Sequence, residues 1–285
     1  MFWIEQGVRI FRVDNPHTKP FAFWEWLIND VKRWHPDVIF LSEAFTRPKI
    51  MYRLAKLGFT QSYSYFTWRN NKQELTEYLQ EITKPAIRDF FRPNFWTNTP
   101  DILTEYLQSG QRSAFIARLV LAATMTANFG VYGPAFELLM STPREPHSEE
   151  YLDSEKYEIP DWQLDCPESL RGVIALVNRA RRENRALQSD ANLEFHIVES
   201  EQLICYSKRT DDNSNVVIVV VNLDPYHAHA ANVELPLARF GIPEDRPYQL
   251  EDYLSGNRYS WQGPQGWVDL APQPMPAHIF RVISS

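Results

Sequence analysis

Two short segments, GVRIFRVDNPH at residues 7–17 and DVIFLSEAF at residues 37–45, set the expected architecture. Each opens with apolar, β-branched or aromatic residues that are typical of a buried strand, and each strand ends on a carboxylate, Asp14 or Glu43. A helical pattern over residues 21–33 lies between them. Strand, helix and strand in this order predict a parallel βα unit, with Asp14 and Glu43 at the same edge of one sheet.

The same alternation continues to about residue 187. Further strands are expected at 59–68, 91–97 and 129–136, and helices at 48–57, 72–82, 111–127 and 168–187. This makes about five βα units, whereas a closed (β/α)8 barrel needs eight. The pattern indicates either an open sheet or a barrel whose first units lie outside the chain. Because Phe2-Trp3-Ile4 already resembles the approach to a buried strand, we expect the C-terminal portion of a longer protein.

Beyond Ala186 the helical signals give way to short β runs, at 194–199, 202–208, 215–223, 231–235, 248–252, 267–270 and 278–283. Such runs in about 95 residues favour an antiparallel β-sandwich. The predicted fold is therefore α/β, with the second half of a (β/α)8 barrel over residues 1–188. A C-terminal β-sandwich domain follows over residues 189–285.

Composition excludes several classes of protein. The 285 residues are 44% hydrophobic and carry a net charge of −7, so a core can form and nucleic-acid binding is disfavoured. Cys166 and Cys205 are too few for a disulfide framework or a four-ligand zinc site, which suits a cytoplasmic protein. No apolar run approaches the roughly 20 residues of a membrane span.

Three carboxylates, Asp14, Glu43 and Asp101, follow predicted strands and are expected to converge on one pocket. Glycosidic chemistry needs such a set, because one carboxylate attacks the sugar and another protonates the leaving oxygen. Arg12 shares a strand face with Asp14 and would keep it ionised, whereas the apolar neighbours of Glu43 would raise its pKa. The alternatives are a helix N-cap for each carboxylate, most of all Asp101, and a structural ion pair for Arg12. The aromatic run at 63–68 is interpreted mainly as core packing, with one sugar-stacking residue left open.

Five motifs carry a resemblance to a known family. They are DNPHTKP at 14–20, SEAFTRP at 42–48, YFTWRN at 65–70, NTPD at 98–101 and YLDSEKY at 151–157. Together they resemble the α-1,4-glucan:maltose-1-phosphate maltosyltransferase family of the α-amylase superfamily, over essentially the whole chain. The chain departs from many amylases at three positions. Asn15 stands where they carry a small residue, and Thr18 and Pro100 stand where they carry histidines.

The resemblance implies a role for each matching residue. Asp14 would be the nucleophile, Glu43 the proton donor and base, and Asp101 the transition-state stabiliser. Substrate-binding residues would be Arg12, Asn15, Lys156 and Tyr157, although the last two could equally belong to a solvated loop. The implied substrates are α-maltose 1-phosphate and an α-1,4-glucan, with no metal ion or organic cofactor, no nucleic acid or membrane partner, and a homodimer.

Two other readings remain open at this point. One is an α-amylase-type hydrolase or glucanotransferase, against which Asn15 and Pro100 weigh. The other is an inactive piece of such an enzyme, because a half barrel exposes edge strands.

Overall fold

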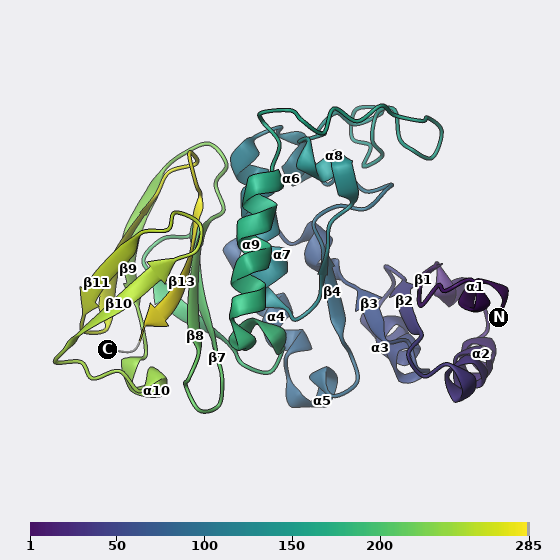
Figure 1. The fold of residues 1–285 in the computed structure, drawn as a ribbon, viewed down its shortest axis with the longest axis horizontal. Coiled ribbons are helices and arrows are strands. Elements are labelled where there is room, and N and C mark those ends of the chain that lie inside the picture. The colour runs from purple at the N-terminus through teal and green to yellow at the C-terminus, as the bar shows by residue number, and fades with distance from the viewer. Residues whose placement is uncertain (284–285) are drawn as a thin grey trace.

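The computed structural model describes residues 1–283 and contains two sheets with helices between and around them (Figure 1). The first sheet is parallel and has five strands in the order β1-β2-β3-β4-β5. Its strands are β1 (Ile10–Asp14), β2 (Ile39–Glu43), β3 (Gln61–Tyr63), β4 (Pro93–Trp96) and β5 (Phe129–Gly130). The sheet order follows the chain order, as expected for consecutive βα units, so the α/β class is confirmed.

Local sequence signals mark the start of some of the helices in this half. The helices are α1 (Phe2–Glu5), α2 (Phe21–Trp34), α3 (Pro48–Lys56), α4 (Lys72–Ile82), α5 (Pro85–Arg88), α6 (Glu105–Gln108), α7 (Arg112–Met125), α8 (Gly133–Glu137) and α9 (Arg171–Glu183). Pro48 occupies the first turn of α3, where a missing N–H costs nothing, and the Asn71 side chain caps α4 by accepting from Glu74 N. Two 3₁₀ turns, η1 (Pro16–Thr18) and η2 (Tyr65–Trp68), follow strands directly, and η3 (Arg185–Gln188) follows α9.

Two predicted strands are shorter than expected. The run at 59–68 forms β3 only to Tyr63 and then turns into η2, although its Tyr and Phe residues have high strand propensity. The run at 129–136 forms two residues of β5 and then α8, since Gly133 takes a positive φ of 23° and Pro134 opens the helix. In both places tertiary contacts and backbone geometry override the residue pattern.

The second sheet is antiparallel throughout, with eight strands in the order β11-β10-β13-β8-β7-β6-β9-β12. They are β6 (Leu193–Val198), β7 (Leu203–Arg209), β8 (Val216–Asn222), β9 (His229–Glu234), β10 (Pro247–Asp252), β11 (Arg258–Gln262), β12 (Gln265–Leu270) and β13 (Ala277–Ile283), with α10 (Leu237–Phe240) between β9 and β10. The sequence prediction missed β11. Two residues connect the end of β11 to the start of β12. β11 and β12, the first and last strands in the sheet order, therefore lie close together, and the sheet curls around its own apolar core.

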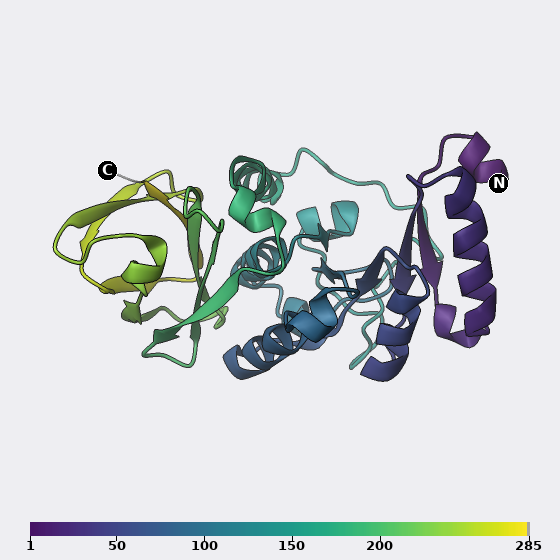
Figure 2. The same ribbon diagram turned by 90° about the horizontal axis from the view of Figure 1, so that it is seen from below.

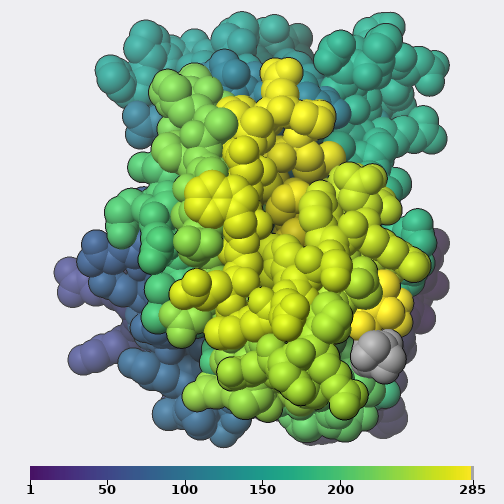
Figure 3. Space-filling model, turned by 90° about the vertical axis from the view of Figure 1, so that its left-hand side faces the viewer, coloured from purple at the N-terminus to yellow at the C-terminus, as the bar shows by residue number. Residues whose placement is uncertain are grey.

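Helix α7 lies between the two sheets and joins their cores (Figures 1 and 2). Every residue from Ser113 to Met125 is buried, which explains why its sequence is apolar on all sides. One core cluster runs from β4 through α7 and α9 to the outer faces of β7, β8 and β13. Their other faces line the second core cluster, inside the curled sheet. Figure 3 shows the molecule from the side of the antiparallel sheet that lies away from α7. Among the helices in the described part of the chain, none has the length and apolarity for a membrane span.

Candidate active site

A single arginine connects the two carboxylates that the sequence singled out. β1 pairs with β2 in a register that sets Asp14 beside Glu43. The Arg12 Nη1 atom lies 3.5 Å from Asp14 Oδ2, and its Nη2 atom contacts Glu43 Oε2. Because both nitrogens belong to one guanidinium, the two carboxyl groups lie on the same side of the sheet and within reach of one another's charge.

The two carboxylates have different environments. The side chain of Asp14 is 64% exposed, on the strand at the edge of the parallel sheet, whereas that of Glu43 is 7% exposed. Burial raises the pKa of Glu43, and the nearby charges of Asp101 and Asp14 act in the same direction while Arg12 opposes them. The site therefore combines a solvated carboxylate with a buried carboxyl that holds its proton more tightly, which is the pairing that acid–base chemistry on a sugar requires.

The turn after β1 ties Asn15 to Glu43. Asn15 has a left-handed backbone (φ 46°, ψ 51°), a conformation that asparagine tolerates better than most residues. Its N–H donates to the Glu43 carbonyl at 3.0 Å, and Thr18 donates its own N–H to the Asn15 carbonyl at 3.0 Å. This geometry ends β1, starts η1 and places Asn15 directly beside the two carboxylates.

The third predicted carboxylate lies in a rigid segment after β4. Asp101 Oδ1 accepts from Thr99 Oγ1 at 3.0 Å, and its charge raises the pKa of Glu43, so the two groups are close enough to interact. The helix N-cap alternative for Asp101 is wrong, because the next helix, α6, begins at Glu105 with Thr104 as its N-cap.

Buried hydrogen bonds hold that segment in place. Asn98 is fully buried, accepts from the Tyr132 N–H at 2.9 Å and donates to the Tyr151 hydroxyl at 2.9 Å. These bonds fix the backbone before Asp101 to α8 and to the loop at 141–165.

Two aromatic residues, Tyr63 and Trp96, belong to the same cluster. The sequence pattern indicated mainly core packing for the run that contains Tyr63, and it did not single out Trp96. The rings of Tyr63 and Trp96 stack with 5.0 Å between centroids. Burial raises the pKa of Tyr63 to about 12, with Glu43 and Asp101 among the smaller contributors and Arg12 opposing. Trp96 Nε1 is buried and has no hydrogen-bond partner among residues 1–283. The signal that could have identified them is their position at the carboxyl ends of β3 and β4, the same edge that carries Glu43.

Among the described residues, Lys156 and Tyr157 form no ion pair or hydrogen bond with Asp14, Glu43 or Asp101. Lys156 Nζ pairs with Glu150 Oε1 at 3.2 Å, which raises the pKa of Lys156, and the charge of Asp101 contributes to the same rise. Tyr157 is 65% exposed, with the Arg144 guanidinium 5.4 Å from its ring centroid. Both lie in the long loop after α8 that runs along one end of the molecule in Figure 1.

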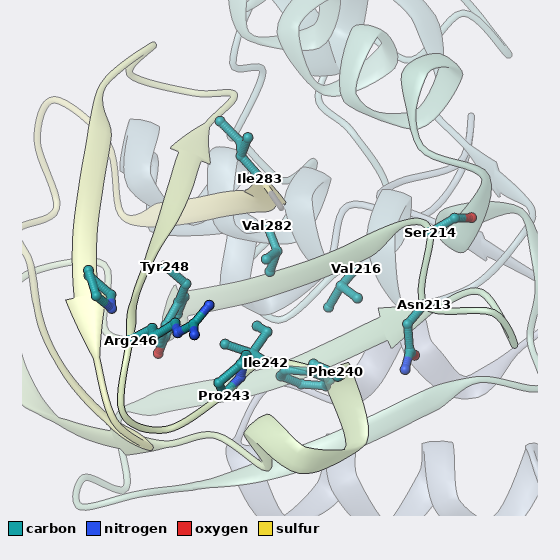
Figure 4. A pocket seen from close by; sticks show the side chains of 12 residues that line it. Asn213, Ser214, Val216, Phe240, Ile242, Pro243, Arg246, Tyr248, Val282 and Ile283 are labelled. Atoms are coloured by element: carbon teal, nitrogen blue, oxygen red, sulfur yellow. The ribbon is translucent and has the colours of Figure 1, made fainter. Parts of the chain in front are cut away.

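One further cavity lies apart from the predicted site residues. A cavity of about 290 Å³ opens among β8, α10, β10 and β13, and none of the predicted site residues lines it (Figure 4). Within residues 1–283, no group of three or more His, Cys, Asp or Glu side chains is arranged to hold a metal ion. The two cysteines are free thiols.

Comparison with known proteins confirms the resemblance that the motifs carry. Residues 195–282 match the family model described as GLGE, C-terminal. The chain is 51% identical to the α-1,4-glucan:maltose-1-phosphate maltosyltransferase of Chlorobaculum tepidum, over 99% of this chain and 43% of that protein. It is 50% identical to maltosyltransferase 1 of Streptomyces coelicolor, over 99% of this chain and 42% of that protein. The chain thus spans about two-fifths of the length of these relatives.

Solved structures show the same fold at much lower identity. An Anoxybacillus α-amylase matches with a TM-score of 0.74 and 13% identity, covering 100% of this chain and 61% of the amylase. The α-amylase of Geobacillus thermoleovorans matches with a TM-score of 0.72 and 14% identity, covering 100% of this chain and 62% of that one. These likenesses establish an α-amylase-like arrangement of the two sheets.

Proposed function

We propose that these 285 residues form part of a retaining maltosyltransferase, given their similarity to proteins of that name. The enzyme would move maltose from α-maltose 1-phosphate to the non-reducing end of an α-1,4-glucan and release phosphate. The observation that carries the proposal is the Arg12 guanidinium, which contacts the exposed Asp14 carboxylate and the buried Glu43 carboxyl at once. A sugar placed over these strand ends would meet a nucleophile and a proton donor together.

In the first step, the Glu43 carboxyl gives its proton to the oxygen that bridges the sugar and the phosphate. Asp14 attacks the anomeric carbon from the opposite face, the carbon–oxygen bond breaks, and phosphate leaves with the proton. The sugar is then held as an ester of Asp14. Asp101 would stabilise the positive charge that develops on the ring, and Asn15 would donate a hydrogen bond to a phosphate oxygen.

In the second step, Glu43 is a carboxylate and accepts the proton of the acceptor's 4-hydroxyl group. The hydroxyl oxygen attacks the anomeric carbon, the ester bond to Asp14 breaks, and Glu43 is protonated again. Two inversions give net retention. Every atom is accounted for without a metal ion or an organic cofactor.

The fold neighbours favour one other activity, since they are α-amylases. A hydrolase or glucanotransferase would use the same two carboxylates with water or a glucan as the second substrate. Asn15 supports the transferase instead, because it follows Asp14 directly, its backbone N–H bonds to the Glu43 carbonyl, and its side-chain amide is a donor that could reach a phosphate oxygen.

We further propose that residues 1–188 are the second half of a (β/α)8 barrel and residues 189–285 a C-terminal β-sandwich domain. The edge position of β1 supports this, as do large apolar side chains exposed around it, including Trp3 at 61%, Ile10 at 57% and Trp26 at 62%. In the complete enzyme, further barrel units would cover them.

We also propose that the complete enzyme is a cytoplasmic homodimer that binds neither nucleic acid nor membranes. Lys156 and Tyr157 would reach the donor sugar when the loop at 141–165 moves.

The decisive experiment measures phosphate release from α-maltose 1-phosphate in the presence of glycogen. We expect release by the complete enzyme that carries this chain and none by its Asp14→Ala variant. The isolated 285 residues are expected to be inactive, because half of the barrel would be missing. Release of reducing sugar into water, in place of phosphate release with glycogen as acceptor, would support the amylase-type alternative. Near-normal turnover by Asp14→Ala would overturn the residue roles.

A further inference from the structure

The loop at residues 44–47, here called the acid/base loop, joins the end of β2 to the start of α3. Glu43 is the last residue of β2, so the loop determines where its side chain points. Within the loop, the Thr46 N–H donates to the Ala44 carbonyl at 2.9 Å. Further contacts come from η2, which follows the neighbouring strand β3.

Two aromatic residues of η2 hold the acid/base loop. The Tyr65 hydroxyl donates a hydrogen bond to the Thr46 carbonyl. The Trp68 ring packs edge-on against the Phe45 ring, with 4.7 Å between centroids. One contact fixes the backbone of the loop and the other fixes a side chain next to it, so the loop cannot shift without breaking both.

The turn that presents these residues is itself anchored from the core. The Arg118 side chain of α7 donates to the carbonyls of Phe66 and Arg69 at 2.7 Å each, and lies 3.8 Å from the Phe66 ring centroid. Trp68 Nε1 donates to Glu149 Oε1 at 2.6 Å on the other side of the turn. η2 is therefore a fixed support against which the acid/base loop rests.

The burial of Arg118 indicates how strongly that support is maintained. Its side chain is 1% exposed and forms no ion pair within the part of the chain that the structure describes. Burying a guanidinium without a carboxylate is costly, and backbone carbonyls together with an aromatic face are its compensation here. The same hydrogen bonds pull residues 65–68 out of the strand that their composition predicts.

We propose that Tyr65 is a positioning residue, which acts through the Thr46 carbonyl to hold the acid/base loop so that Glu43 stays aimed at the reacting bond. Arg118 supports it by fixing η2. The inference rests on the proposed role of Glu43 and adds to it the device that keeps this carboxyl in place. It assigns a function to the YFTWRN motif that the reaction scheme leaves unused.

The test compares two variants that each lose a single tyrosine hydroxyl. Tyr65→Phe deletes the hydrogen bond to Thr46. Tyr52→Phe is the matched control. Tyr52 belongs to α3 and lines the same cavity as Tyr65. Its hydroxyl donates to Glu81 Oε1 at 2.5 Å and, among the described residues, to neither η2 nor the acid/base loop. Both rings stay in place, so both proteins should fold.

The first measurement is backbone hydrogen exchange over residues 44–50, which needs no substrate. We expect faster exchange in Tyr65→Phe and unchanged exchange in Tyr52→Phe. Unchanged exchange in Tyr65→Phe would overturn the proposal, whether or not the enzyme has the proposed activity.

The second measurement is the pH dependence of phosphate release. The groups that face Glu43 are Arg12 and Asp14 of β1, Tyr63 of β3, and Asp101 after β4. Tyr65→Phe leaves all of them intact but should admit water around Glu43. We expect kcat to fall between about tenfold and a hundredfold with little change in KM, and the alkaline limb of the profile to move to lower pH.

A merely structural role for Tyr65 would reduce the amplitude of the profile without moving its limb, and that result would overturn the proposal. Arg118→Met provides a second variant, for which we expect the same shift of the limb. If Arg118→Met does not fold, Tyr65→Phe still decides the question. If the unsubstituted enzyme releases no phosphate, the proposed function fails, and the exchange measurement alone decides whether Tyr65 fixes the loop.

Discussion

At the scale of single residues, the site depends on the Arg12 guanidinium, which contacts the carboxyl groups of both Asp14 and Glu43. Arg12 lowers the pKa of Glu43, while burial, the larger effect, raises it. The net result is a carboxyl that stays protonated to higher pH than usual and can act as an acid. Asp14, in contrast, lies largely in solvent and is available as a nucleophile.

This balance predicts the effect of removing the arginine. In Arg12→Gln, Glu43 loses the charge that favours its ionised form, so its pKa should rise further. The step that needs protonated Glu43 should then persist to higher pH, which a single-turnover profile of phosphate release would show. Arg9→Gln is the control, since Arg9 pairs with Asp37 at 2.8 Å, away from the carboxylates, and its profile should keep the original limb.

The two roles of Glu43 predict a trapped intermediate. In Glu43→Ala, phosphate can still leave because it is a good leaving group, but no base remains to activate the acceptor. We expect turnover to fall by about a hundredfold to ten-thousandfold and a maltosyl ester to accumulate on Asp14, seen as added mass in the intact protein. Absence of the adduct in Glu43→Ala, or its presence in a double variant that also carries Asp14→Ala, would contradict this.

At the scale of secondary-structure elements, the floor of the site is set by the close approach of β4 and β5. Gly130 of β5 lies under the indole of Trp96, and a Cβ at residue 130 would come within 2.5 Å of the ring. Only glycine allows this approach, and Trp96 in turn stacks on Tyr63. The packing of β3, β4 and β5 therefore depends on the absence of a side chain at Gly130.

Gly130→Ala should therefore disturb the site through packing. We expect it to lower the free energy of unfolding by about 1–3 kcal/mol, measured by urea denaturation, and to reduce activity as the indole moves. Gly172→Ala is the matched control, because a Cβ at residue 172 of α9 meets no atom of the described residues within 4 Å. That variant should be as stable as the parent or more so. Equal stability losses in both would refute the explanation.

At the scale of the whole molecule, the antiparallel sheet is fixed to the helices by a core that also buries polar groups. Tyr206 of β7 shares a 2.6 Å hydrogen bond with Thr124 of α7. Lys208 of β7 is 1% exposed at the same interface, and burial lowers its pKa to about 8. We therefore expect the contact between the two halves of the chain to respond to pH.

The sign of that response follows from the lysine's pKa in each state. The unfolded chain, with a lysine pKa near 10.5, binds more protons than the folded one between about pH 8 and pH 10.5, so the free energy of unfolding should rise across this range. Lys208→Met removes the buried charge and should be neutral or more stable by about 1–4 kcal/mol at pH 7. Its advantage should shrink as the pH rises, which urea denaturation at several pH values would show. An advantage that grows with pH would contradict this.

Local patterns predicted much of the architecture. The sequence predicted five parallel strands in chain order, the helices between them and the change to antiparallel strands near residue 190. These features can be predicted because strand and helix periodicities and capping residues act over a few neighbouring residues. The positions of Asp14, Glu43 and Asp101 after strands were readable for the same reason. The strand β11 was missed, although its residues alternate between exposed and partly buried positions. The resemblance to a family was found from short motifs alone.

What the sequence determined by itself is therefore the class of fold and the identity of the candidate carboxylates, since both follow from local order along the chain. Only the tertiary structure decided that Arg12 contacts both Asp14 and Glu43, that Tyr63 and Trp96 complete the cluster, and that residues 65–68 form a turn. Each of these depends on groups far apart in the chain, such as Arg118 and the Phe66 carbonyl. Contacts of this kind are set by the packing of whole elements, which no local pattern encodes.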